Sequence, residues 1–203
     1  MTKHKGVPVS ERALIQRINR KLASDLEVLK TARGRRAEFD LGRYYVIDLR
    51  GIARGDLDDG VAAARLFVAS GILAVRQTKN DQRQPVPAGA GDGAIAAPVV
   101  LIVDQGTSGA AEVFAAALLD NGRATLVGEQ TIGRTARQQL VKLPDGSGLL
   151  LSNVRYLTPK GQPIHETGIQ PTYRVEQPEV EFGATAPTPD ATLARALEVA
   201  ARL

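Results

Sequence analysis

The chain has 203 residues, of which 43% are hydrophobic and 24% are charged, a composition that excludes a globally disordered protein. Cysteine is absent, which excludes disulfides and thiolate catalysis, and two histidines, His4 and His165, are too few for a multi-histidine metal site. No cofactor is expected. No apolar run is long enough to predict a membrane span, and the first ten residues lack the apolar stretch of a signal peptide.

The net charge of +4 is concentrated at the start of the chain. Residues 1–43 carry eleven basic and five acidic residues, whereas the rest of the chain carries fifteen and seventeen. Within this segment, residues 10–33 are predicted to form an amphipathic helix that Ser10 caps and Gly34 ends. Its basic surface is interpreted first as a solvated face and second as a surface for nucleic acid or an acidic partner. The predicted apolar stripe is Leu14, Ile18, Leu22, Leu26 and Leu29.

The middle of the chain alternates predicted strands and helices. Residues 44–49 form a short run rich in β formers, which predicts a buried strand, and a glycine-containing turn separates it from a helix over 57–69. Residues 79–97 are rich in Pro and Gly and predict a flexible loop. A second buried strand over 98–103 leads through another turn into a helix over 110–121. This order predicts an α/β layer.

A third strand over 124–127 and a hairpin follow. The turn Pro144–Ser147 lies between the apolar segments 139–143 and 148–152, which is typical of a β-hairpin, and residues 154–157 extend its second strand or form another.

The end of the chain is predicted to be a linker and a helix. Residues 176–188 are rich in Pro and Glu, and Thr188 is a predicted N-cap with Pro at the first helical position. The chain therefore divides into a basic helical segment (1–43), a core (44–175) and a linker with a C-terminal helix (176–203). The residues predicted to face inward from that helix are Leu193, Leu197, Ala200 and Leu203.

Several short motifs between Tyr45 and Val175 occur in one order. They are Ile47–Arg50 before a glycine turn, Thr107–Glu112, Asp120–Ala124, Val127–Glu129, Ile132–Arg134 with Gln138, Leu143–Ser147, Arg155–Gly161 and Gly168–Pro171. No single motif is decisive, but the ordered set resembles the carboxyl-terminal processing proteases, also called tail-specific proteases. The resemblance implies a serine peptidase with a ClpP/crotonase-like α/β core.

The resemblance also implies a serine–lysine dyad, in which a lysine amine takes the proton of a serine at a helix N-terminus. In this sequence the nucleophile position falls on Gly109 and the general-base position on Arg134, while the glutamine that helps to orient the lysine is kept as Gln138. Glycine has no side chain, and a guanidinium does not accept a proton at neutral pH. The resemblance therefore predicts a degenerate peptidase domain.

The resemblance also implies an oxyanion hole of backbone N–H groups, which is better preserved in this sequence than the dyad. The family's oxyanion hole uses two N–H groups, which fall here on Gly55 and Ala110, although Arg54 replaces the first glycine of the family's Gly-Gly pair. Arg134 has two interpretations: it binds the C-terminal carboxylate of a peptide beside helix N-terminal N–H groups, or it fills the lysine's space and pairs with an acid.

Ser108 is the alternative nucleophile. The preferred interpretation is a helix N-cap, because one position along a helix turns a side chain by roughly 100° and would point the hydroxyl away from the reaction centre. Lys142 and Lys160 fit a hairpin and a loop rather than the base position. His165 is interpreted as a surface-loop residue, and a Ser108–His165 pair stays open.

The leading functional hypothesis is binding of a peptide or protein C-terminus without hydrolysis. A working serine peptidase that uses Ser108 is the first alternative, and a nucleic-acid-associated protein is the second and least favoured one. A homo-oligomer stays open. Location is undetermined, because no signal peptide is visible although the family is usually exported. The family's usual PDZ domain is not visible either, and residues 1–43 offer no obvious strand partner for residues 44–49.

Overall fold

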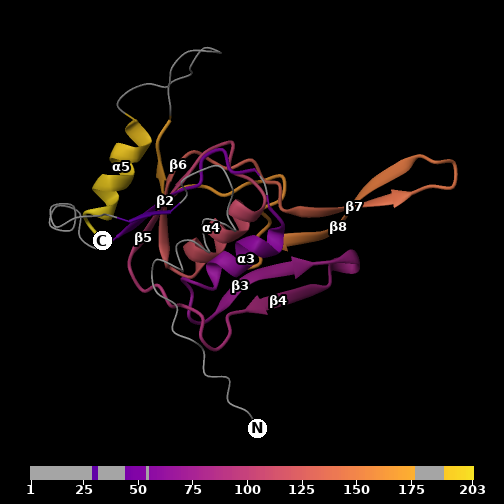
Figure 1. The fold of residues 1–203 in the computed structure, drawn as a ribbon, viewed down its shortest axis with the longest axis horizontal. Helices are drawn as coiled ribbons and strands as arrows, with labels where there is room; N and C mark the ends of the chain where they lie inside the picture. The colour runs from indigo at the N-terminus through magenta and orange to yellow at the C-terminus, as the bar shows by residue number, and fades with distance from the viewer. Residues whose placement is uncertain (1–28, 32–43, 54, 177–189) are drawn as a thin grey trace, which may run out of the picture.

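Two β-sheets organise the part of the chain that the computed structural model describes, namely residues 29–31, 44–53, 55–176 and 190–203 (Figure 1). Most of the predicted helix over 10–33 lies outside these residues, and so do most of the basic residues to which the nucleic-acid hypothesis refers. The predicted cap Thr188 lies outside them as well.

The first sheet has five strands in the order β1-β2-β5-β6-β9. β1 is antiparallel to β2, and β2, β5, β6 and β9 run parallel to one another. This confirms that the three predicted strands belong to one sheet. The strands are β1 (Leu29–Thr31), β2 (Tyr45–Asp48), β5 (Val99–Val103), β6 (Ala124–Gly128) and β9 (Tyr173–Arg174).

Helices cover both faces of this sheet. All five residues of β5 are buried, because Leu101 packs with the helices α3 (Leu57–Ala64) and α4 (Ala110–Asp120) on one face, while Ile102 packs with α5 (Ala191–Ala200) on the other. Figure 1 shows α5 on one side of β2, β5 and β6, and α3 and α4 on the other. Burial on both faces explains why the strand is a continuous apolar run rather than an alternating one.

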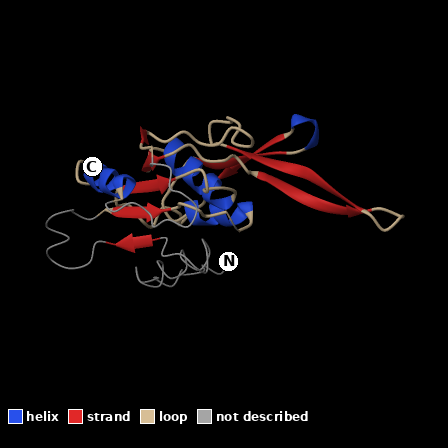
Figure 2. Ribbon diagram, turned by 90° about the horizontal axis from the view of Figure 1, so that it is seen from above, coloured by secondary structure: helices blue, strands red, loops and turns tan. Residues whose placement is uncertain are grey.

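The second sheet is antiparallel, with strand order β4-β3-β8-β7. β7 and β8 confirm the predicted hairpin, and they extend well away from the body of the molecule (Figures 1 and 2). Leucines on this extension are about half exposed, for example Leu140 and Leu150. The strands are β3 (Ile72–Gln77), β4 (Arg83–Pro87), β7 (Ala136–Lys142) and β8 (Gly148–Leu157).

Two predictions between residues 57 and 97 are wrong. The flexible loop over 79–97 contains a 3₁₀ turn (Lys79–Asp81) and β4, which pairs with β3; an edge strand tolerates Pro85 and Pro87 because its outer N–H groups have no strand partner. The helix over 57–69 ends at Ala64. The apolar pattern continued beyond that point because Phe67 and Val68 are buried in the core without being helical.

Predictions at the two ends also need correction. Leu29–Thr31 is a strand where a helix was expected, so the strand over 44–49 does have a partner in the N-terminal segment. At the other end Asp190 caps α5, and Leu193 and Leu203 are exposed rather than inward.

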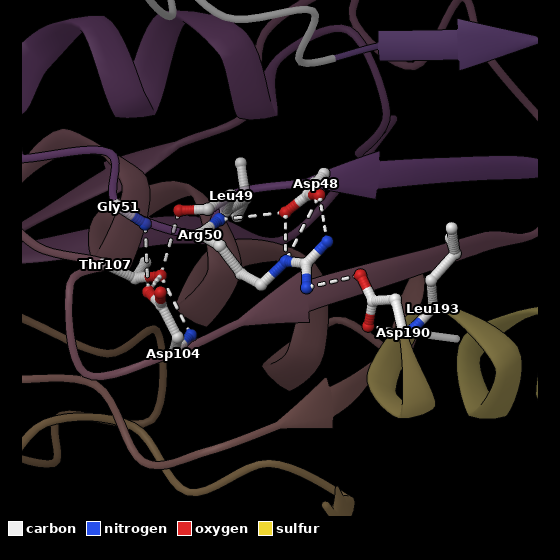
Figure 3. Close-up of polar contacts among 8 residues, drawn as sticks. All are labelled: Asp48, Leu49, Arg50, Gly51, Asp104, Thr107, Asp190 and Leu193. Carbon is white, nitrogen blue, oxygen red and sulfur yellow. Dashed lines mark hydrogen bonds and ion pairs between the residues drawn. The ribbon is translucent and has the colours of Figure 1, made fainter. Parts of the chain in front are cut away.

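The buried stripe of α5 lies one residue earlier than predicted. Asp190 accepts a hydrogen bond from the Leu193 amide and forms an ion pair of 2.7 Å with Arg50, which also binds Asp48 at the end of β2 (Figure 3). This anchor fixes where the helix starts and therefore which residues face the sheet. Those residues are Thr192, Ala196, Val199 and Ala200.

Candidate functional site

A cavity of about 230 Å³ lies at the N-terminal end of α4. It brings together four residues that the sequence singled out, Gly55, Ser108, Gly109 and Arg134, whereas Gln138 is exposed on β7 and does not line it. The remaining lining residues are Ala53, Asp56, Leu57, Ala136 and Arg137.

The parallel strands β2 and β5 determine where this cavity lies. β2 and β5 end at the same edge of the sheet, so the loops that follow them meet there. The Thr107 hydroxyl donates to the Leu49 carbonyl at 2.9 Å, and the Gly51 amide donates to Asp104 at 3.0 Å (Figure 3). The Ser108 amide donates to the Ile52 carbonyl at 2.8 Å. These bonds hold the two loops together beside the cavity.

Gly109, not Ser108, is the N-cap of α4. Its φ of 64° and ψ of −121° lie in a region that residues with a side chain rarely adopt, which suits glycine. A Cβ built on Gly109 would nevertheless meet only ordinary contacts, at 3.8 Å from the Arg134 carbonyl oxygen and 4.0 Å from Leu57. The position thus has room for a side chain, and the prediction that Ser108 caps the helix is wrong.

Glu112 stabilises the turn at the start of α4. Its side chain is fully buried and accepts four hydrogen bonds, which together define the Glu112 cluster. The donors are the Gly109 amide at 3.0 Å, the Thr131 hydroxyl at 2.5 Å, the Gly133 amide at 2.6 Å and the Arg134 amide at 2.8 Å. One carboxylate therefore fixes the backbones of Gly109 and Arg134 relative to each other. Sequence reasoning assigned Glu112 no role, although a glutamate three residues after a helix N-cap is the spacing of a capping box.

A second polar group, the Asp58 cluster, borders the other side of the cavity. Asp58 accepts hydrogen bonds from the Tyr156 hydroxyl at 2.6 Å, from Arg137 at 2.8 Å and from Arg76, and Arg137 also binds Asp56 at 2.6 Å. The cluster joins the start of α3 to β3, β7 and β8.

Charge in the Asp58 cluster is balanced by these donors. Burial acts to raise the pKa of Asp58, but the Tyr156 hydroxyl and the Arg137 and Arg76 guanidiniums outweigh it and lower that pKa to about 2. Burial and the hydrogen bond to Asp58 raise the pKa of Tyr156 to about 12. Both groups therefore keep one protonation state at neutral pH, which marks them as positioning groups rather than as an acid or base.

Arg134 and Ser108 differ from expectation in their surroundings. The expected pairing of Arg134 with an acid is not found among the described residues, where its exposed side chain forms no ion pair. Ser108 is only 3% exposed and lines the same cavity as Gly109. Ser108 lies in the turn before the helix, so the argument from helical rotation does not apply to it.

Among the described residues, no lysine or histidine lines the cavity beside Ser108, and the carboxylate that does, Asp56, is bound to Arg137 at 2.6 Å. Lys142 ends β7 and Lys160 pairs with Asp120 at 3.4 Å, so the structure places both in the hairpin and the loop, as expected. His165 does not line the cavity either; its Nδ1 is buried without a partner among the described residues, and its Nε2 lies 3.9 Å from Glu166. The structure thus does not bring Ser108 and His165 together there.

The described residues offer no group of three or more side chains that could bind a metal ion. None of the helices in the described ranges is both long and apolar enough to cross a membrane.

Comparison with known proteins identifies the fold and the family. The model of peptidase family S41 matches residues 20–175. The carboxyl-terminal-processing protease of Synechocystis sp. is 37% identical over 76% of this chain and 36% of its own length, and that of Bacillus subtilis is 34% identical over 66% and 29%.

Among solved structures, the photosystem II D1 C-terminal processing protease matches 64% of this chain and 34% of its own, with 35% identity and a TM-score of 0.59. This chain thus spans about a third of the length of these relatives. The ClpP/crotonase-like α/β fold that the sequence predicted is confirmed, and the chain belongs to peptidase family S41.

Proposed function

We propose that this domain binds unstructured peptide segments at the cavity and does not hydrolyse them. The observation that carries the proposal is that Gly109 and Arg134, the residues that the family resemblance assigns to the two dyad positions, line one cavity. The first offers no nucleophile, and the second carries a guanidinium in place of the amine that acts as the base in the family's dyad.

The backbone around the cavity supports retained binding. The Glu112 cluster holds the turn at Gly109 against the segment that carries Arg134. A Cβ on Gly55 would lie 3.4 Å from the Ala110 Cβ, so the two residues proposed as oxyanion donors are neighbours. A site of this kind accepts a peptide carbonyl whether or not a nucleophile is present.

Hydrolysis by Ser108 is the second candidate, favoured by one observation. The Ser108 hydroxyl has no hydrogen bond within the described residues, and Ser108 lines the cavity. Its weakness is that no lysine or histidine of the described residues lines the cavity and that the carboxylate of Asp56 is bound to Arg137, because an unassisted serine hydroxyl is a poor nucleophile at neutral pH.

Incubation with a panel of unstructured peptides distinguishes the two candidates. We expect NMR shift changes at the amides of Gly55, Ala110 and Arg134, with every peptide recovered intact by mass spectrometry. Peptide cleavage that disappears in Ser108→Ala would replace the binding proposal with the second candidate. Absence of shift changes with all peptides would refute binding at the cavity.

A further inference from the structure

We infer that the β7–β8 hairpin is an interface between two copies of this chain, in which the outer edge of β7 pairs antiparallel with the same edge of a second copy. The two sheets then join into one, with the order β4-β3-β8-β7-β7-β8-β3-β4. The inference goes beyond the proposed function and rests on other observations. These are exposed apolar side chains on the hairpin, an open strand edge and a sequence that is self-complementary in this pairing.

Exposed apolar side chains gather on the hairpin. Among the described residues eleven large hydrophobic residues are exposed, and six of them lie here, with exposed fractions from 38% to 59%. The hairpin extends away from the body of the molecule, so the described elements leave these side chains uncovered (Figures 1 and 2). Adjoining exposed apolar side chains mark an interaction surface. The six residues are Leu140, Val141, Leu143, Leu149, Leu150 and Leu151.

The outer edge of β7 offers backbone groups to a further strand. β7 is the last strand in the order of its sheet, so one of its sides has no strand partner among the described residues. The Leu143 amide donates to the Ser147 carbonyl, on the side of β8, at 2.8 Å. Residues of an antiparallel strand direct their N–H and C=O groups to alternate sides, so those of Leu140 and Lys142 point outward. Such a row of groups is a template for strand pairing.

The opposite edge of the same sheet is blocked. There β4 contains Pro85 and Pro87, which have no N–H group to donate. β7 has seven residues and no proline, and its bulge lies near its start, between Arg137 and Gln138. Because one edge is open and the other is blocked, pairing through these edges closes at two copies and does not continue as a fibre.

The sequence of β7 is self-complementary about Leu140. A two-fold axis at this residue places Leu140 beside Leu140 of the second copy, and Gln138 opposite Lys142, so no like charges face each other along the strands. Leu150 lies opposite Leu140 across the hairpin, on the same face of the sheet. Two leucines from each copy therefore form one continuous row across the joined sheets.

Charge also favours a second copy as the partner. In this register the turn of one hairpin comes level with the start of β7 in the other copy, which places Asp145 beside Arg134. Asp145 is exposed, and within the described residues its carboxylate accepts hydrogen bonds from Ser147 of its own turn. The exposed guanidinium of Arg134 forms no ion pair among the described residues. The two-fold axis brings these opposite charges together at both ends of the pairing.

Sedimentation equilibrium of the full chain over a wide range of concentrations tests the inference. We expect a monomer–dimer equilibrium for the wild type. Leu140→Lys should weaken dimerisation at least about tenfold, because it places two like charges side by side at the axis. Leu193→Lys is the matched control, because Leu193 is an exposed leucine on α5, and it should dimerise as the wild type does. Circular dichroism verifies that each variant is folded.

Oxidative cross-linking tests the register without adding a charge. The chain has no cysteine, so Leu140→Cys introduces a single thiol at the axis. Paired residues there have Cα atoms about 5.5 Å apart, within the range of a disulfide, and we expect a covalent dimer. Lys142→Cys is the comparison and should not cross-link with itself, because the two copies of that residue lie roughly 13 Å apart along the strands.

Four results would overturn the inference. The first is a wild type that stays monomeric at every concentration. The second is a folded Leu140→Lys variant that dimerises as tightly as the wild type, and the third is association beyond the dimer. The fourth is cross-linking of Lys142→Cys that equals or exceeds that of Leu140→Cys, which would exclude the two-fold axis at Leu140.

Discussion

The Glu112 and Asp58 clusters border the same cavity but differ in burial and in what they hold. Glu112 is fully buried, and its donors are three backbone amides and one threonine hydroxyl. The side chain of Asp58 is 42% exposed, and its donors are the side chains of Arg76, Arg137 and Tyr156. The first cluster fixes the backbone of the two dyad positions, and the second joins neighbouring elements at the rim.

This difference predicts which residues around the cavity contribute most to the stability of the fold. The buried cluster holds the backbone of the turn, whatever side chains Gly109 and Arg134 contribute to the cavity. The side chains of Ser108 and Arg134 form no bonds within the described residues, so they contribute to the cavity and not to the fold. Effects on stability should therefore fall in the order Glu112 cluster, Asp58 cluster, cavity side chains.

Glu112→Ala should have the largest effect. It leaves the buried Gly133 amide and the part-buried Gly109 and Arg134 amides without their acceptor, and each buried donor left unsatisfied costs about 1–3 kcal/mol of unfolding free energy. Chemical denaturation measures it. Glu198→Ala is the control, because Glu198 is exposed and, among the described residues, pairs with Arg195 alone, and it should cost less than about 0.5 kcal/mol. Equal costs for the two would contradict the role of the cluster.

Gly133→Ala tests the same cluster through its backbone. Gly133 has a φ of 84°, and a Cβ there would lie 2.7 Å from both the Gly168 amide and the Ile164 carbonyl oxygen. Gly51→Ala provides the comparison, since Gly51 has a φ of 69° but nothing within 4 Å of a Cβ. Gly51→Ala should lower the unfolding free energy by only about 1 kcal/mol, which is the backbone strain. Gly133→Ala should lower it by about 1–3 kcal/mol more, because its Cβ also meets close contacts. Unfolding free energies that do not differ would show that the 131–134 segment is loosely held.

Asp58→Asn should reveal a smaller, pH-dependent effect. The pKa of Asp58 is lowered to about 2 in the folded state, so its contribution to stability is present above the unfolded pKa of about 4 and is lost as pH falls through 2. Because Asp58 is 42% exposed, solvent screening limits this contribution to about 1 kcal/mol. The unfolding free energies of wild type and Asp58→Asn should therefore differ at pH 7 and converge by pH 2. A constant difference across that range would contradict the account.

Arg134→Gln should have the smallest effect on stability, within about 0.5 kcal/mol, because its side chain has no partner within the described residues. Thermal or chemical unfolding checks this directly. A loss of more than about 1 kcal/mol of unfolding free energy would show that Arg134 supports the fold. It would favour the alternative interpretation that Arg134 fills the space of the family's lysine.

Local patterns were enough to predict much of the fold. The β formers at 44–49 and 98–103 mark buried strands, and the turn Pro144–Ser147 between apolar segments marks the hairpin. The sequence failed where tertiary contacts override the pattern. Burial of Phe67 and Val68 continues the apolar periodicity past the end of α3, and the Arg50–Asp190 ion pair sets which face of α5 meets the sheet.

The candidate site was predictable only in part. The ordered motifs located Gly109 and Arg134, and the parallel strands bring them to one cavity. The Glu112 cluster was not predictable in full, because three of its four donors come from residues 131–134, about twenty positions along the chain. The prediction that Ser108 caps α4 was wrong by one residue, because Gly109 is the N-cap and Ser108 lies in the turn before the helix.

The central claim is that hydrolysis is absent because of two residues in an otherwise formed site. The most direct measurement compares cleavage of unstructured peptides by wild type, Gly109→Ser, Arg134→Lys and the double variant, with Ser108→Ala as control. Gly109→Ser has room for its side chain, although a φ of 64° makes it strained. We predict no cleavage by wild type or by either single variant, and turnover by the double variant, which supplies both a nucleophile and a base. Cleavage by wild type that Ser108→Ala abolishes would contradict the claim.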